Sequence, residues 1–353
     1  MTTRRSLLTG LAVAPALATP ALAQSTTEWR MVTSWPKNLP GPGVTAQRLA
    51  DRIGELSGGR LTVKLYAAGE IVPPLEVFRA VSDGTAQMAH TASLFWGGTI
   101  PAAPLFTAGP FGLTPLEHIT WIEHGGGQAV WDALYEPFGV KPFMAGNTGF
   151  QMGGWFKRKL AGLDDLKGLR IRMPGLGGEV MSRLGAAPVT LPPGEILTAL
   201  QTGVIDATEF LGPFSDFAAG FWRTARYYYA PGWHEPNGTG EALVSLSALA
   251  ALPDDLQSIV RHACMAENVY ALAESEWQNA AQLRTLVEEK GVEIVDYPAD
   301  VVAAARDATV DVMRDLASRD GGSARAVASY QAAASHLDPW SRTSVQKFLA
   351  ARG

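Results

Sequence analysis

Apolar residues follow two different spacings along the chain. In "EWRMVTSW" and "RLTVKLYAA" apolar and polar positions alternate, whereas in the intervening "TAQRLADRIGELSGG" the apolar positions recur every three or four residues. Alternation is typical of a β-strand, and the longer spacing is typical of an α-helix. The same order continues with a helix in "PPLEVFRAVSDG" and a strand in "AQMAHTAS". This pattern predicts an α/β fold with mixed or mostly parallel sheets flanked by helices.

A second set of strands and helices begins at "GVKPFMAGNTGFQMGGWF". It contains the strand "LKGLRIRMPG", a helix from Gly178 to Leu184, and "PVTLPPGEILTALQTGVIDATEF", which reads as a strand, a helix started by proline and another strand. Extended segments near residues 147–155 and 233–246 join the two sets. We therefore predict two lobes with a ligand cleft between them, the first from residues 24–148 and about 238–275, the second from residues 149–237.

The C-terminal region, residues 253–353, has a mostly helical pattern. Its first part, residues 253–290, reads as one helix that is longer than a compact lobe needs. The apolar positions of this helix predict a face that packs either on both lobes or on a second subunit, as in a homodimer.

The N-terminus has the pattern of an export signal. In "TTRRSLLTG" two arginines precede an alanine-rich apolar run that closes on "PALAQ", where small residues fit a cleavage site before Gln24. We expect residues 1–23 to be a signal peptide and the mature protein to be periplasmic. The paired arginines resemble a twin-arginine signal, although Sec signals also carry two basic residues. The run holds two prolines and is too short for a spanning helix.

Composition and charge exclude several classes of protein. The net charge is −5, the pI is about 5.7, and acidic and basic residues are interspersed. Without a basic stripe, no nucleic-acid partner is expected. Cys264 is the only cysteine, so the chain has neither an intramolecular disulfide nor a cysteine-based metal site, and Cys264 is expected to be buried as a small apolar residue.

Catalytic and nucleotide-binding motifs are missing as well. The sequence has no HExxH, GxSxG or P-loop pattern, and "GLGGEV" has Val180 where a dinucleotide-binding loop wants a third small residue. His234 and Glu235 are adjacent in "GWHEP"; as neighbours in a strand they would point to opposite faces and make a poor acid–base pair. We therefore do not expect an enzyme.

Polar residues in extended, glycine- and aromatic-rich stretches are the remaining candidates for a site. They are Gln151 in "GFQMGGW", Arg172 in "IRMPG", Glu209 in "DATEFLGPF" and Glu235 in "GWHEPNG". In the strand "LKGLRIRMPG" the two arginines share one face, and we expect Arg170 to remain solvated.

The succession "GGRLTVKLYAAGEI", "NTGFQMGGWF", "DLKGLRIRMPG", "LTALQTGVIDATEF" and "YYYAPGWHEPN" resembles the extracytoplasmic solute-binding proteins of TRAP transporters. This DctP-like family has the two-lobed fold of periplasmic binding proteins, and the resemblance covers essentially the whole mature chain. The pieces "GNTGFQMGGWF" and "GWHEP" are more specific to the branch that binds 2-oxo and 2-hydroxy monocarboxylates.

The resemblance implies a set of roles. Arg172 would bind the ligand carboxylate through two parallel hydrogen bonds, for which guanidinium is better shaped than lysine. A sodium or calcium ion would bridge protein and ligand, held by the Gln151 amide oxygen, Glu209, the Phe210 carbonyl and Glu235, an all-oxygen set that suits a hard cation.

Three further expectations concern the pocket itself. Related sequences often carry an indole where Phe210 stands, so the pocket volume is expected to differ. Asn147 is a candidate to contact the ligand's second oxygen, and Trp96, in "SLFWGG", is a candidate for the pocket wall.

The implied function is that of a non-catalytic periplasmic receptor that delivers a small monocarboxylate to a TRAP-type membrane permease. The cargo would be a 2-oxo acid such as pyruvate, a 2-oxo fatty acid, or a 2-hydroxy acid. Two alternatives stay open: an exported metal-dependent hydrolase or lyase with Glu209 or Glu235 as base, and a sensor subunit for a histidine kinase. The sequence does not decide ligand chain length, oxo against hydroxy, or sodium against calcium.

Overall fold

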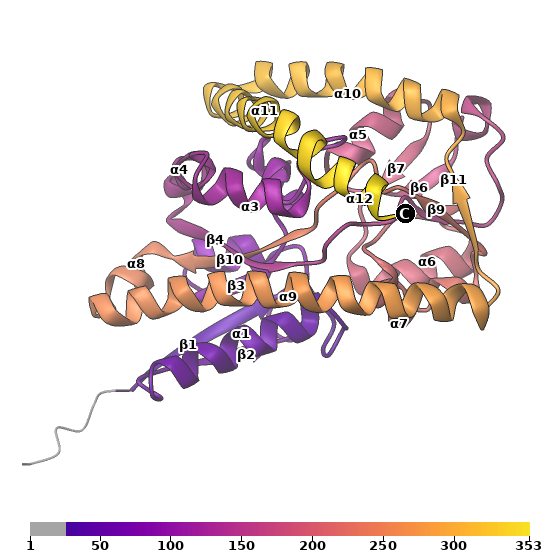
Figure 1. The fold of residues 1–353 in the computed structure, drawn as a ribbon. Helices are drawn as coiled ribbons and strands as arrows, with labels where there is room; N and C mark the ends of the chain where they lie inside the picture. Colours follow the sequence, from indigo (N-terminus) through magenta and orange to yellow (C-terminus); the bar gives the residue numbers. More distant parts are fainter. Residues whose placement is uncertain (1–25) are drawn as a thin grey trace, which may run out of the picture.

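The computed structural model describes residues 26–353, so the predicted signal peptide and its paired arginines lie outside the described residues. Two sheets form the body of the described chain (Figure 1). The first has the order β2-β1-β3-β10-β4, with β1 parallel to β2 and β3, and β10 antiparallel to β3 and β4. Its strands are β1 (Thr27–Thr33), β2 (Leu61–Tyr66), β3 (Met88–Thr91), β4 (Val140–Asn147) and β10 (Thr239–Ser245).

The second sheet has the order β11-β9-β5-β8-β6-β7. Strand β5 runs antiparallel to β8 and β9, and the other pairs are parallel. Its strands are β5 (Gly154–Phe156), β6 (Arg170–Arg172), β7 (Ala187–Val189), β8 (Ala207–Thr208), β9 (Tyr227–Ala230) and β11 (Glu293–Asp296). The chain crosses between the sheets after β4, after β9 and, through α9, after β10. Each sheet contains parallel and antiparallel pairs, which confirms the α/β fold with mixed sheets.

Helices connect the strands and cover the sheets. They are α1 (Pro42–Leu56), α2 (Val77–Ser82), α3 (Pro115–Glu123), α4 (Gly127–Tyr135), α5 (Gly175–Arg183), α6 (Ile196–Thr202), α7 (Pro213–Ala219), α8 (Leu246–Ala250), α9 (Asp254–Glu288), α10 (Ala299–Arg319), α11 (Gly321–Ser341) and α12 (Lys347–Arg352). Short 3₁₀ turns occupy Ser93–Trp96, Ala103–Phe106, Glu136–Phe138, Leu163–Leu166, Pro193–Glu195 and Phe221–Arg223, and a π turn occupies Arg342–Gln346. Helix α5 begins three residues earlier than expected, because Pro174 stands at its N-cap, where proline does not oppose a helix.

Each sheet and the helices packed on it form one half of the molecule, the first half around β1 and the second around β5. The long helix α9 runs along both halves (Figure 1). It packs against α1 and β4 on one side of the crossing segments and against α7 on the other. Cys264 is fully buried on α9, as expected. The mostly helical C-terminal region also contains a strand that the sequence pattern did not predict: β11 follows α9 and extends the second sheet beside β9.

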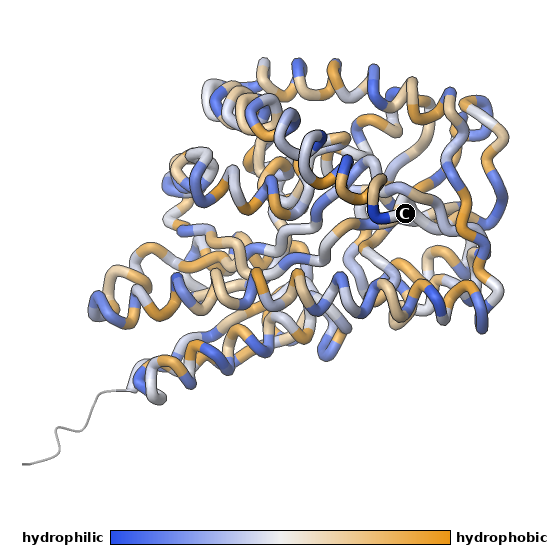
Figure 2. The backbone as a smooth tube through the Cα atoms, in the orientation of Figure 1, coloured by the Kyte–Doolittle hydropathy of each residue, from blue (hydrophilic) through white to orange (hydrophobic). Residues whose placement is uncertain are grey.

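One hydrophobic cluster joins the two halves. It includes Val32 and Leu243 from the first sheet, Ile171 and Tyr229 from the second, and residues of α10 and α11. Figure 2 shows hydrophobic and hydrophilic residues interspersed along α9 and α10. In the described part of the chain, no helix combines the length and the apolar character needed to cross a bilayer.

Candidate functional site

A cavity lies between the two sheets and is lined by residues from both halves of the molecule. Several of its lining residues stand at the ends of strands: Asn147 ends β4, Arg172 ends β6, and Glu209 follows β8. This is the usual place for a ligand in an α/β protein, because the chain leaves the sheet there and side chains of several strands converge. The cavity is therefore the candidate binding site.

The charged side chains of the cavity come from the second sheet and the segments that follow its strands. Among the lining residues they are Arg172 at the end of β6, Glu209 after β8, and Glu235 in the segment that returns from β9 to β10. The first half contributes aromatic and aliphatic side chains, such as Trp35 and Phe95. A ligand with one charged end and one apolar end would thus find partners of both kinds in this cavity.

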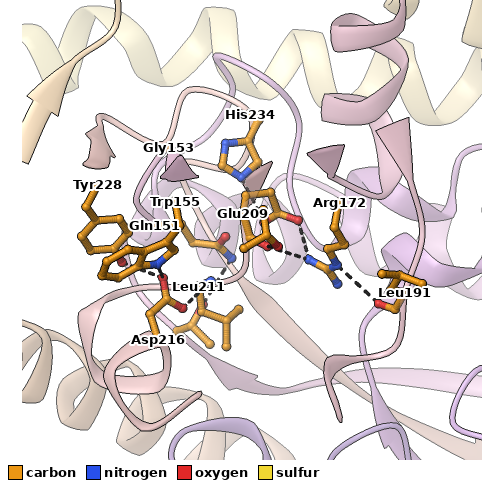
Figure 3. Close-up of polar contacts among 12 residues, drawn as sticks. Gln151, Gly153, Trp155, Arg172, Leu191, Glu209, Leu211, Asp216, Tyr228 and His234 are labelled. Atoms are coloured by element: carbon orange, nitrogen blue, oxygen red, sulfur yellow. Dashed lines mark hydrogen bonds and ion pairs between the residues drawn. The ribbon is translucent and has the colours of Figure 1, made fainter. Parts of the chain in front are cut away.

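Arg172 is buried, with 2% of its surface exposed, and two of its three guanidinium nitrogens donate hydrogen bonds within the protein. Nη1 donates to a Glu209 carboxylate oxygen at 2.5 Å and to the Glu209 carbonyl at 3.2 Å, while Nε donates to the Leu191 carbonyl at 3.3 Å (Figure 3). Its guanidinium carbon lies 5.7 Å from the centre of the Phe210 ring. Nη2 has no hydrogen-bond partner among the described residues, so it remains available for an anion in the cavity.

Glu209 holds the centre of the charged cluster. One of its carboxylate oxygens accepts from Arg172, and the other lies 3.2 Å from His234 Nε2. Ligand atoms of Glu209, His234 and Glu235 all lie within 4.8 Å of one another. The expected opposite orientation of His234 and Glu235 is wrong, because these residues lie at a turn and not in a strand, so both side chains turn toward Glu209.

The surroundings of Glu235 disfavour a negative charge. Burial and the neighbouring Glu209 carboxylate raise the pKa of Glu235 well above its ordinary value, against the opposing effect of Arg172. Two buried carboxylates beside one guanidinium leave an excess of negative charge if both are ionised. A bound cation would offset that excess.

Gln151 provides the clearest indication that a cation fits here. Its amide oxygen is buried and has no hydrogen-bond partner within the described chain, while its amide nitrogen lies 3.4 Å from Thr148 Oγ1. Buried carbonyl oxygens are rarely left unpaired, because the lost hydrogen bond costs free energy. Together with the Glu209 and Glu235 carboxylates, this oxygen makes a donor set suited to sodium or calcium. Those residues and the Phe210 carbonyl would hold the ion.

Two expected pocket residues have other partners in the structure. The Trp96 indole is buried and donates to Glu241 at 2.5 Å, so it lies outside the cavity, and its neighbours Leu94 and Phe95 form the wall instead. Asn147 lines the cavity, but its amide nitrogen donates to Asn237 at 2.8 Å and to Thr239 at 3.2 Å. Both amide hydrogens of Asn147 are thereby used within the protein.

Sequence reasoning missed the wall formed by Trp35 and His90. Trp35 Nε1 donates to His90 Nδ1 at 2.8 Å, and His90 Nε2 lies 3.1 Å from the Ala145 carbonyl. Burial lowers the pKa of His90 to about 4, so the ring is neutral and both nitrogens are occupied. This wall therefore offers the cavity no charge. No spacing signal marks the pair, since 55 residues separate them.

Comparisons with known proteins identify the relatives of this chain. A family model described as bacterial extracellular solute-binding protein, family 7, matches residues 31–320. A monocarboxylate 2-oxoacid-binding periplasmic protein from Nostoc sp. is 40% identical over 316 residues, which are 90% of this chain and 86% of that protein.

Solved structures show the same fold. A TRAP periplasmic solute-binding protein from Pseudoalteromonas atlantica with bound sodium and pyruvate has a TM-score of 0.90 and 35% identity, covering 92% of this chain and 99% of that one. A TRAP solute-binding protein from Bordetella bronchiseptica, a dimer with calcium and picolinate in one site, has a TM-score of 0.90 and 33% identity, covering 93% and 97%. The predicted resemblance is confirmed, and this chain belongs to family 7 of the bacterial extracellular solute-binding proteins.

Proposed function

We propose that this protein is a periplasmic receptor that binds a small 2-oxo monocarboxylate together with a sodium or calcium ion. The observation that carries the proposal is the buried Arg172 beside two buried carboxylates. Within residues 26–353, the Arg172 Nη2 and the Gln151 amide oxygen have no hydrogen-bond partner. The relatives named above bind 2-oxo acids, or pyruvate or picolinate with sodium or calcium.

Charge counting explains why the ion and the acid should bind together. Glu209, Glu235 and a ligand carboxylate would bring three negative charges to one positive charge on Arg172. Like charges in a poorly hydrated cavity repel strongly, so the acid alone would bind weakly. A cation shared between Gln151, the two glutamates and the ligand would offset the repulsion.

The apolar wall bears on the rest of the ligand. With the carboxylate at Arg172, the chain of the acid would face Trp35, Leu94 and Phe95. A short alkyl chain suits this uncharged surface, and a second carboxylate there would be left without a partner. This favours monocarboxylates over dicarboxylates.

Isothermal titration calorimetry of the dialysed mature protein tests the proposal. We expect pyruvate to bind in the presence of sodium or calcium and to bind much more weakly when both are replaced by a bulky organic cation. Native mass spectrometry of freshly purified protein should show a carried acid. If no 2-oxo or 2-hydroxy monocarboxylate binds with either ion, the proposed ligand class is wrong.

The receptor would act with membrane proteins and without chemistry of its own. We propose delivery to a TRAP-type permease after export by the twin-arginine route, in keeping with the family and the paired arginines. A turnover assay on bound acids separates this function from the hydrolase or lyase alternative, because product formation would overturn it. Whether the neighbouring genes encode a permease or a histidine kinase separates transport from sensing.

We also propose a homodimer that uses the outer face of α9. Val269, Tyr270 and Trp277 are exposed on this helix, and Trp277 is 78% exposed. Large aromatic side chains are enriched at protein interfaces, and burial of this face in a second copy would remove them from water. Size-exclusion chromatography with light scattering would give a monomer mass if the proposal is wrong.

A further inference from the structure

Three buried carboxylates of the described chain lie outside the cavity. Glu267 is paired with Arg48 and Arg52 at 2.7 and 3.2 Å, which accounts for its charge. Glu241 accepts only from side chains in the core of the first half. Asp216 differs from both, because it accepts a hydrogen bond from the backbone of a segment that lines the cavity.

Asp216 lies in the first turn of α7 and is fully buried. One carboxylate oxygen accepts from the Leu211 backbone N–H at 3.1 Å. The other accepts from Trp155 Nε1 at 2.9 Å and from the Tyr228 hydroxyl at 2.7 Å (Figure 3). Trp155 and Tyr228 belong to β5 and β9, and their rings are stacked 3.9 Å apart. The carboxylate thus attaches the chain after β8 to the centre of the second sheet.

Leu211 is the junction between two segments of the site. Its N–H donates to Asp216, and its carbonyl accepts from the Met152 N–H at 3.2 Å. The neighbouring Gln151 carbonyl accepts from Gly232 N–H at 3.1 Å. The residues proposed to hold the cation therefore lie on backbone segments that are hydrogen-bonded to one another. The hydrogen bond from the Leu211 N–H to Asp216 holds this junction in place.

We propose that Asp216 is a positioning residue for the cation and carboxylate site. By fixing Leu211, it sets the path of the backbone that carries Glu209 and the Phe210 carbonyl, and through Met152 it sets the place of Gln151. This inference rests on the proposed function, since it concerns the same site. Removing a group that hydrogen-bonds to metal ligands, without itself contacting the metal, commonly lowers metal affinity by about 10- to 100-fold.

Only a carboxylate satisfies this arrangement. Three donors converge on Asp216, and each oxygen receives at least one of them. In Asp216→Asn the amide nitrogen must face either the Leu211 N–H or the Trp155 Nε1–H, so two donors would be placed against each other. Tyr228→Phe is the matched control, because it removes one donor to Asp216 but keeps the bond to Leu211.

The test compares these two variants of the mature protein. Calcium is titrated alone, followed by calorimetry with pyruvate at saturating calcium, and hydrogen–deuterium exchange is measured at the Leu211 and Met152 amides. For Asp216→Asn we expect calcium and pyruvate dissociation constants to rise about tenfold or more, with faster exchange at both amides. For Tyr228→Phe we expect a lower melting temperature but affinities within about twofold of the wild type.

The outcomes separate this inference from the proposed function. If the wild type binds pyruvate and Asp216→Asn binds it equally well, the positioning role is wrong and the function stands. If both variants lose affinity equally, Asp216 acts through general stability, which also overturns the proposal. If the wild type binds no acid, the function fails and this inference fails with it. Should Asp216→Asn not fold, Asp216→Glu keeps the charge but displaces the oxygens, and unchanged calcium affinity would contradict the proposal.

Discussion

Arg172 is the residue whose truncation should most directly remove ligand capture. In Arg172→Ala the ligand carboxylate would meet Glu209 and Glu235 without the guanidinium, so we expect its dissociation constant to rise about 100-fold, or about 3 kcal/mol. The fold should be retained, because the side chain of Arg172 bonds to Glu209 and to the Leu191 backbone carbonyl at the cavity and contributes no apolar side chain to the hydrophobic clusters. Calorimetry measures the affinity, and circular dichroism checks the fold.

Arg170 on the same strand is the control for this change. Its side chain is 49% exposed and pairs with Asp206 at 2.6 Å. Exposed ion pairs contribute little, so Arg170→Ala should bind the acid within about twofold of the wild type. Equal affinities for the two alanine variants would refute the role of Arg172.

Glu235 tests the shared cation at the same scale. In Glu235→Gln the side chain keeps its size but loses a charged oxygen, so we expect calcium and pyruvate affinities to fall together, by about tenfold or more. If the ion and the acid share the site, binding of one helps binding of the other, and calorimetry at several calcium concentrations measures this coupling. The bridging ion would be contradicted if the variant binds calcium more weakly but binds pyruvate as tightly as the wild type, with an affinity that does not depend on the calcium concentration.

Single residues also show where sequence reasoning reaches and where it ends. Gln151, Arg172, Glu209 and Glu235 do converge on one cavity, because each follows or ends a strand at a predictable edge of the fold. The direction of Trp96 was not predictable, since its indole is fixed by Glu241, which lies 145 residues further along the chain.

At the scale of elements, α7 and the segment before α1 make a contact beside the cavity. Ser215 Oγ in α7 donates to the Pro40 carbonyl at 2.9 Å. The adjoining Gly41 has a φ of +81°, and a Cβ there would lie 2.7 Å from the Ser215 hydroxyl oxygen. Only glycine allows this close approach without strain. The contact joins the two halves beside lining residues, so it should stabilise the ligand-bound arrangement.

Ser215→Ala removes this hydrogen bond and little else. A hydrogen bond is worth about 1 kcal/mol, so we expect the ligand to dissociate about fivefold faster, with an unchanged association rate. Stopped-flow tryptophan fluorescence measures both rates. Thr202→Ala is the control, because that hydroxyl bonds only within α6. An unchanged dissociation rate would show that the contact does not contribute to retention.

Elements differ in how well the sequence predicts them. The long helix was expected over residues 253–290 and is observed from Asp254 to Glu288, because many turns of helical spacing reinforce one another. Strand β11 was missed: it has only four residues, lies at the edge of the sheet and pairs with β9 alone. Its side chains do not alternate between buried and exposed positions, so the sequence lacks the alternation of apolar and polar residues that indicates a strand.

At the scale of the whole molecule, buried ionisable groups set the dependence of stability on pH. Burial raises the pKa of Asp216 and of Glu241 to about 7 and lowers the pKa of His90 and of His118 to about 4. The carboxyl groups hold more protons in the folded state, so they make the unfolding free energy fall as pH rises toward 7. The histidines hold fewer, so they make it rise with pH up to about 6.5.

Glu241→Gln isolates one of these opposing contributions. Ser93, Trp96 and Tyr135 donate to Glu241, and no basic group offsets its charge among the causes of its raised pKa. The difference between the folded-state pKa of about 7 and the ordinary pKa of 4.5 corresponds to about 3 kcal/mol of unfolding free energy, which is present at low pH and lost as pH rises through 7.

Glutamine resembles the protonated acid and does not titrate. We therefore expect the unfolding free energy of the variant, relative to the wild type, to increase by about 2–3 kcal/mol between pH 5 and pH 8. Urea unfolding of the ligand-free proteins at both pH values measures this difference, in which the histidine contributions cancel; parallel pH profiles would mean that Glu241 stays ionised throughout.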